Sequence, residues 1–187
     1  MFQVMLALLF ALSLSHAHAQ EVRAELSKQP PDVRQIVSTW LLKDCDLPQQ
    51  AVGLNIRSRL TELGQRLEPV FWEAYNLGPT VQEIEQMATS ARTAYAARQK
   101  WLREHGEELL GREESQRQVN VGEEEFLARE LQNYTTVYKS AALAALGITG
   151  TEQTLVRLRD IAANQQSLDA STAQEAIRSL GDRLQRR

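Results

Sequence analysis

The chain has few of the side chains with which proteins catalyse reactions or bind transition metals. It contains one cysteine, Cys45, and three histidines, of which only His105 lies beyond residue 19. A zinc site needs several convergent His, Cys or carboxylate ligands, and a nucleophilic triad needs a histidine base. A single cysteine also excludes an internal disulfide. The sequence therefore predicts a protein with no metal site, no cofactor and no enzyme activity.

Phosphate-binding glycine motifs and an excess of basic charge are missing too. The nine glycines form neither a GxGxxG nor a GxxxxGKS/T pattern, so the usual backbone cradles for nucleotide phosphates are excluded. The 21 basic and 24 acidic side chains leave a net charge of −3. A nucleic-acid-binding domain usually carries a basic face. We therefore expect no nucleic-acid partner.

Charged side chains are absent from the first 19 residues. An apolar run over residues 4–12 leads to Ala17-His18-Ala19, a small-x-small site of the kind that signal peptidase cuts. A signal peptide has an apolar core of about 7–15 residues, whereas a membrane span needs about 20. We therefore expect a cleaved signal peptide over residues 1–19 and export to the periplasm or the extracellular space. An uncleaved anchor is the alternative. Because secreted animal domains are usually rich in disulfides, the lone cysteine favours a bacterial protein.

Negative charge is concentrated in the middle of the chain. Residues 103–130 hold nine glutamates and four arginines, a local charge of −5, whereas the remainder is +2. Charge runs usually form a solvated connection between helices, and three glycines within 106–122 predict the main internal linker there. The alternative is a face for a basic partner or a divalent cation. Glu123, Glu124 and Glu125 are the partner-binding candidates of this segment.

Every sustained apolar periodicity in the chain is helical. Apolar residues recur at steps of three and four, and no segment shows the alternation typical of a strand. Two patterns of the capping-box type, Thr80–Glu83 and Ser171–Gln174, mark helix starts. The sequence therefore predicts an all-α fold, built of stacked helix pairs or an irregular bundle, in a single domain over residues 20–187. The periodic segments are 33–41, 52–63, 67–77, 84–102, 127–145, 155–162 and 173–184.

The last third of the chain resembles a HEAT-type helical repeat of the Ala/Leu-Gly variety. The matching text is AALAALGI over residues 141–148, LVRL over 155–158 and AIRSLG over 176–181. The Leu-Gly pairs at 146–147 and 180–181 lie about one such repeat apart. The resemblance covers residues 136–187. It departs from the family in the turn, where Thr149-Gly150-Thr151 replaces an Asp-Pro-Arg-like element. It implies stacked helix pairs that present a groove to a protein partner.

The three tryptophans lie in three different predicted helices. Trp40 lies on an apolar stripe and is expected in the core. Trp72 and Trp101 lie beside their stripes, and we expect them to be partly exposed. Exposed tryptophan is frequent at the centres of protein interfaces, so both are partner-binding candidates. Packing at the edge of the core is the alternative.

Two further residues are candidates for a chemical role. Glu73 stands between Trp72 and Ala74 and is the candidate for a general acid held in an apolar pocket, as in lysozyme-type enzymes. Its helical phase lies off the apolar stripe, so we expect it to face water. His105 precedes Gly106 and is expected at a helix C-terminus, where positive side chains are favourable.

The sequence thus favours an exported, non-catalytic helical module that binds another exported or envelope protein. One alternative is a small protein that binds or cleaves cell-wall glycan. Another is a structural protein that associates with copies of itself. Each remains open from the sequence because no motif identifies a ligand.

Overall fold

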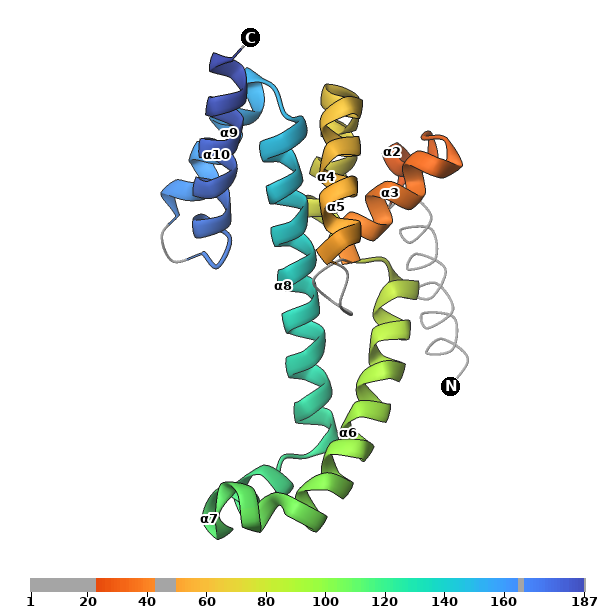
Figure 1. Cartoon of the computed structure of the whole chain (residues 1–187), viewed down its shortest axis with the longest axis vertical. Helices are drawn as coiled ribbons and strands as arrows, with labels where there is room; N and C mark the ends of the chain where they lie inside the picture. The colour runs from red at the N-terminus through yellow and green to blue at the C-terminus, as the bar shows by residue number, and fades with distance from the viewer. Residues whose placement is uncertain (1–22, 43–49, 165–166, 187) are drawn as a thin grey trace, which may run out of the picture. The chain divides into compact units, whose positions relative to one another are not determined.

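The computed structural model describes residues 23–42, 50–164 and 167–186. These ranges are helical almost throughout and contain no strand (Figure 1). The predicted all-α class is therefore confirmed. The expected signal peptide, residues 1–19, and Cys45 lie outside the described residues.

The described helices form two compact units. Unit 1 comprises the described residues up to Thr80 and from Thr136 onward, and unit 2 comprises Val81–Thr135. The helix α8 begins in unit 2 and ends in unit 1. The helices are α2 (Ala24–Ser27), α3 (Pro31–Leu42), α4 (Gln50–Leu63), η1 (Gly64–Leu67), α5 (Glu68–Leu77), α6 (Val81–Leu110), α7 (Arg112–Val119), α8 (Glu123–Thr149), α9 (Glu152–Ala163) and α10 (Ala170–Gln185).

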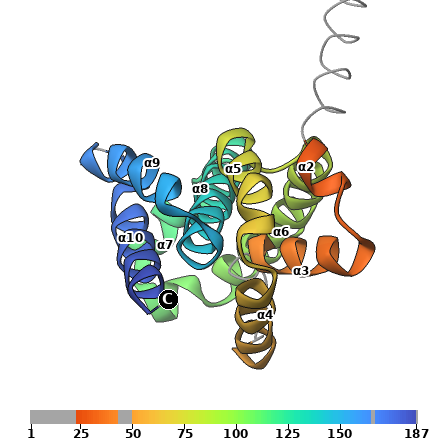
Figure 2. The same ribbon diagram turned by 90° about the horizontal axis from the view of Figure 1, so that it is seen from above.

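The C-terminal part of α8 is the centre of unit 1. Residues 141–150 are all buried except Ala144, as expected for a helix that is apolar on every side. The Nε1 atom of Trp40 donates a hydrogen bond to the carbonyl oxygen of Ala141 at 2.8 Å, which holds α3 against α8. Figure 2 shows α9 and α10 side by side, next to α8. The surrounding helices contribute these buried side chains to the core: Trp40, Leu60, Phe71, Leu158 and Leu180.

Small residues allow α8 and α10 to approach closely. Ala141 is 3% exposed and Ala145 is fully buried. A Cβ atom on Gly147 would lie only 2.9 Å from the Cα atom of Ala176 on α10. Any larger side chain at this position would therefore meet the backbone of the neighbouring helix.

Three polar side chains of α5 tie distant segments of unit 1 together. Glu73 is half-buried, and its carboxylate accepts hydrogen bonds from the backbone N–H groups of Glu25 at 3.1 Å and Leu26 at 3.3 Å. The expectation that Glu73 faces water is wrong, because α2 packs over it. The hydroxyl of Thr154, at the start of α9, donates to Glu68. The Tyr75 hydroxyl donates to Asp169, just before α10, at 3.0 Å.

Unit 2 consists of α6, α7 and the first part of α8. The sequence predicted a helix end at Gly106 and a linker over 106–122, but α6 continues to Leu110 and α7 occupies most of the remainder. Gly106 lies where α7 comes close, since a Cβ atom there would be 2.5 Å from Ser115 Oγ. The turn between the helices is made by Gly111, whose φ of +80° favours glycine. His105 is consequently an exposed residue within α6 and not a helix end.

Candidate functional site

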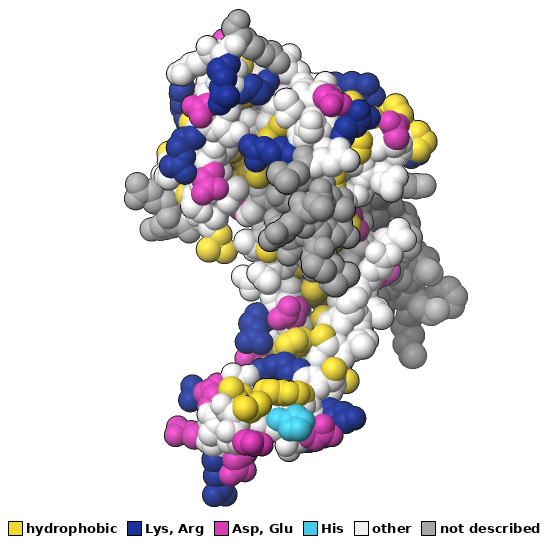
Figure 3. Space-filling view, viewed as in Figure 1, with side chains coloured by type: hydrophobic (Ala, Val, Ile, Leu, Met, Phe, Trp, Pro, Cys, Tyr) yellow, Lys and Arg dark blue, Asp and Glu magenta, His cyan; other side chains and the backbone are white. Residues whose placement is uncertain are grey.

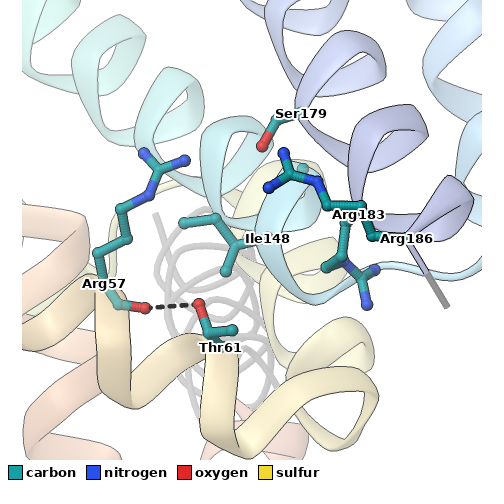
Figure 4. Close-up of a pocket in the computed structure, with 7 residues that line it drawn as sticks. Arg57, Thr61, Ile148, Ser179, Arg183 and Arg186 are labelled. Atoms are coloured by element: carbon teal, nitrogen blue, oxygen red, sulfur yellow. Dashed lines mark hydrogen bonds between the residues drawn. The ribbon is translucent and has the colours of Figure 1, made fainter.

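The described residues contain no group of His, Cys, Asp or Glu side chains that could hold a metal ion. The feature with the most distinctive chemistry is an arginine-rich cavity of about 230 Å³ in unit 1, which we call the arginine pocket. It is bounded by α4, α8 and α10 (Figure 4). Its lining residues are Arg57, Thr61, Gly147, Ile148, Ser179, Arg183 and Arg186.

Helical spacing places these side chains around one opening. Arg57 and Thr61 lie one turn apart on the same face of α4, and the Thr61 hydroxyl donates to the carbonyl oxygen of Arg57 at 2.9 Å. The three residues from α10 follow one another at steps of four and three. Figure 4 shows Arg57 on one side of Ile148 and the two arginines of α10 on the other. The small Gly147 brings α10 close enough for both groups to share the cavity.

The pocket carries permanent positive charge without a carboxylate in its lining. Guanidinium groups stay protonated at any physiological pH and present several N–H donors in one plane. Arg57 and Arg186 are exposed, and neither forms an ion pair with a described residue. Arg183 donates to the carbonyl oxygen of Gly150 and so also stabilises the C-terminal end of α8. The pocket is therefore suited to bind an anion.

A second cavity adjoins the arginine pocket along α10. It has a volume of about 350 Å³ and shares Arg57 and Ser179 with the first. Its lining adds the carboxylate of Glu175, which lies 3.9 Å from Arg178 Nη2. A bound segment longer than a single anionic group therefore has room to continue along α10.

The acidic residues that the sequence singled out lie in unit 2. Glu123, Glu124 and Glu125 form the first turn of α8, and all three are exposed. The Oε1 atom of Glu123 lies 3.8 Å from Arg92 Nε on α6, and both side chains are more than half exposed. Within the described part of the chain, Glu124 and Glu125 form no ion pair. Both carboxylates therefore face solvent.

The two tryptophan candidates differ in their exposure to solvent. Trp101 is 42% exposed, as expected, and its ring lies 6.2 Å from that of His105. Figure 3 shows hydrophobic side chains exposed among charged ones in this unit. The exposure expected for Trp72 is wrong: it is 6% exposed, and the guanidinium of Arg157 on α9 lies 3.5 Å from its ring centroid. Trp72 lies in unit 1 and Trp101 in unit 2.

Sequence reasoning missed the arginine pocket. The spacing of Ser179, Arg183 and Arg186 on one helix face was visible in the sequence, but such a face is usually only solvated. No local signal connects α10 with Arg57, more than a hundred residues earlier. Only the packing of α4 and α10 against α8 brings these side chains together.

The chain has no match among protein-family models, curated proteins or solved structures. None of the described helices combines the length and the apolar character needed to cross a membrane.

Proposed function

We propose that the protein is an exported, non-catalytic helical module whose arginine pocket binds an acidic segment of a partner protein. The observation that carries this proposal is the composition of the pocket, which holds three arginines and two hydroxyls. Guanidinium groups bind carboxylates through paired, charge-assisted hydrogen bonds. General acid–base catalysis needs a group that exchanges protons near neutral pH, and the lining contains no histidine, cysteine or carboxylate. The pocket is thus equipped to hold an anion and not to transform it.

Two features favour a protein segment as the ligand. The adjoining cavity extends the binding surface along α10 beyond a single anionic group. The HEAT-type resemblance of residues 136–187 also points to stacked helices that bind an extended partner. Export remains part of the proposal on the strength of the charge-free apolar run and Ala17-His18-Ala19. The partner is then another exported or envelope protein.

The experiment is a titration of the mature protein, residues 20–187, into a fluorescently labelled glutamate-rich peptide of unrelated sequence. Because exposed ion pairs are individually weak, the variant removes two together, Arg57→Gln with Arg186→Gln. Arg183 is kept because of its bond to Gly150. We expect fluorescence anisotropy to report a dissociation constant roughly ten times higher for this variant, and weaker binding of the unmodified protein as salt is added.

The matched control removes the same charge elsewhere, Arg34→Gln with Arg159→Gln. Both residues are exposed and line no pocket described above. The control should bind the peptide as the unmodified protein does. An equal loss in the two variants would assign the binding to net charge and contradict a site at the pocket.

A further inference from the structure

We infer that the acidic segment is supplied by a second copy of this chain. In this arrangement the first turn of α8 in one copy, Glu123–Glu125, binds the arginine pocket of the next copy. We call these three residues the acidic turn. The inference rests on the proposed function, because it requires that the pocket bind carboxylates of a protein.

The acidic turn has the properties that such a ligand needs. Its three carboxylates are exposed and consecutive, so at 3.6 residues per turn they spread over more than half of the circumference of the helix. Glu124 and Glu125 form no ion pair within the described residues, and Glu123 is only loosely placed near Arg92.

The net charges of the two units are also opposite in sign. Unit 2 contains eleven acidic and seven basic side chains, which give it a net charge of −4. Unit 1 contains thirteen acidic and fourteen basic side chains, which give it a net charge of +1. The pocket and the acidic turn carry three charges each, of opposite sign. Long-range attraction therefore favours an encounter of unit 2 of one copy with unit 1 of another.

The proposed contact joins two different surfaces of the chain. The acidic turn is the first turn of this 27-residue helix, and Gly147 and Ile148 of the pocket lie in its last turn. The contact is consequently head-to-tail between copies, and each added copy leaves one free pocket and one free acidic turn.

The test uses two variants and their mixture, followed by sedimentation velocity. The pocket variant carries Arg57→Gln and Arg186→Gln, and the turn variant carries Glu123→Gln, Glu124→Gln and Glu125→Gln. We expect the unmodified protein to assemble in a concentration-dependent and salt-sensitive way, and each variant alone to associate at least tenfold more weakly. An equimolar mixture should form a complex of one copy of each, because the turn variant keeps its pocket and the pocket variant keeps its acidic turn.

A matched control replaces three exposed glutamates outside the acidic turn, Glu107→Gln, Glu108→Gln and Glu113→Gln. This variant has the same net charge as the turn variant and should assemble like the unmodified protein. Recovery of association in the mixture also shows that both variants are folded, since a misfolded copy would contribute neither surface.

The remaining outcomes separate this inference from the proposed function. If the protein binds the glutamate-rich peptide but stays monomeric at high concentration, the partner is another protein and the inference is wrong. If it neither binds the peptide nor assembles, the proposed function fails as well. Assembly that persists in both variants would place self-association on another surface and overturn the inference.

Discussion

Gly147 and Gly181 each follow a leucine within a helix, yet their surroundings differ. A Cβ atom on Gly147 would lie 2.9 Å from the Cα atom and 3.0 Å from the carbonyl oxygen of Ala176. A Cβ atom on Gly181 would meet no other side chain or helix within 4 Å. At the residue scale, the same dipeptide therefore marks a close helix–helix approach at one position and open space at the other.

This difference predicts opposite effects of one substitution. We expect Gly147→Ala to lower the free energy of unfolding by about 1–3 kcal/mol, because the added methyl overpacks a close contact. Gly181→Ala should be neutral or should raise it by about 0.5–1 kcal/mol, because alanine is the better helix former. Urea unfolding followed by circular dichroism measures both. Equal effects would contradict the close approach of α8 and α10.

Tyr75 gives the stability of unit 1 a dependence on pH. Burial and the hydrogen bond to Asp169 raise the pKa of Tyr75 from 10.0 to about 12. The folded state therefore holds the phenol proton more tightly than the unfolded state does. The stability that results is fully present below pH 10 and is lost as the pH rises from 10 toward 12.

The expected result is a smaller loss of stability at alkaline pH in Tyr75→Phe than in the unmodified protein. The comparison between the two proteins isolates the tyrosine from every other group that changes its charge at alkaline pH. Chemical unfolding at pH 9 and pH 11 measures it. Identical losses in both proteins would show that the phenol is not held by Asp169.

At the element scale, α8 changes character along its length. Its last three turns are buried on nearly every side, whereas Ala128 in its early part is exposed. A single helix thus serves as the centre of unit 1 and as an amphipathic wall of unit 2. Its sequence changes in the same direction, from glutamate-rich at the start of the helix to alanine-rich toward its end.

The change predicts that one substitution has unequal effects at two points of α8. Ala145 is fully buried, so Ala145→Leu should overpack the core of unit 1 and cost about 1–3 kcal/mol. Ala128→Leu adds the same atoms at an exposed position and should change stability by less than about 0.5 kcal/mol. Thermal melts compare the two. A melt of Ala145→Leu that matches the unmodified protein would mean that this face of α8 is not packed.

At the scale of the whole molecule, the two units differ in the size of their cores. Most buried apolar side chains belong to unit 1. Among the described residues of unit 2, polar side chains share the interior with a small apolar set. Small domains bury a smaller fraction of their surface and are correspondingly less stable. The buried side chains of unit 2 are Ala91, Gln99, Leu102, Ser115, Phe126 and Tyr134.

We therefore expect calorimetry to resolve two unfolding transitions, the first from unit 2. Leu102→Ala should remove about 2–5 kcal/mol from unit 2 and shift or abolish the first transition. Leu143→Ala should act on the second transition, because Leu143 lies in the core of unit 1. A single transition that both variants shift equally would show that the two units unfold together.

Local sequence patterns were sufficient to predict some features of this protein. The periodicity of residues 127–145 predicted a helix there, and α8, which spans Glu123–Thr149, contains the whole segment. Helical period, caps and small residues act over a few neighbouring positions, so the sequence by itself determined the helical class and most helix positions.

Only the tertiary structure determined which helices pack against one another and which side chains they bring together. Whether Trp72 is exposed depended on α9, which packs over it, and whether residues 106–122 form a linker depended on the contact of Gly106 with Ser115. The arginine pocket exists because α4 and α10, distant in sequence, both pack against α8. Such contacts depend on which apolar faces meet, and each helix can bury its stripe against several partners, so no local pattern specifies the choice.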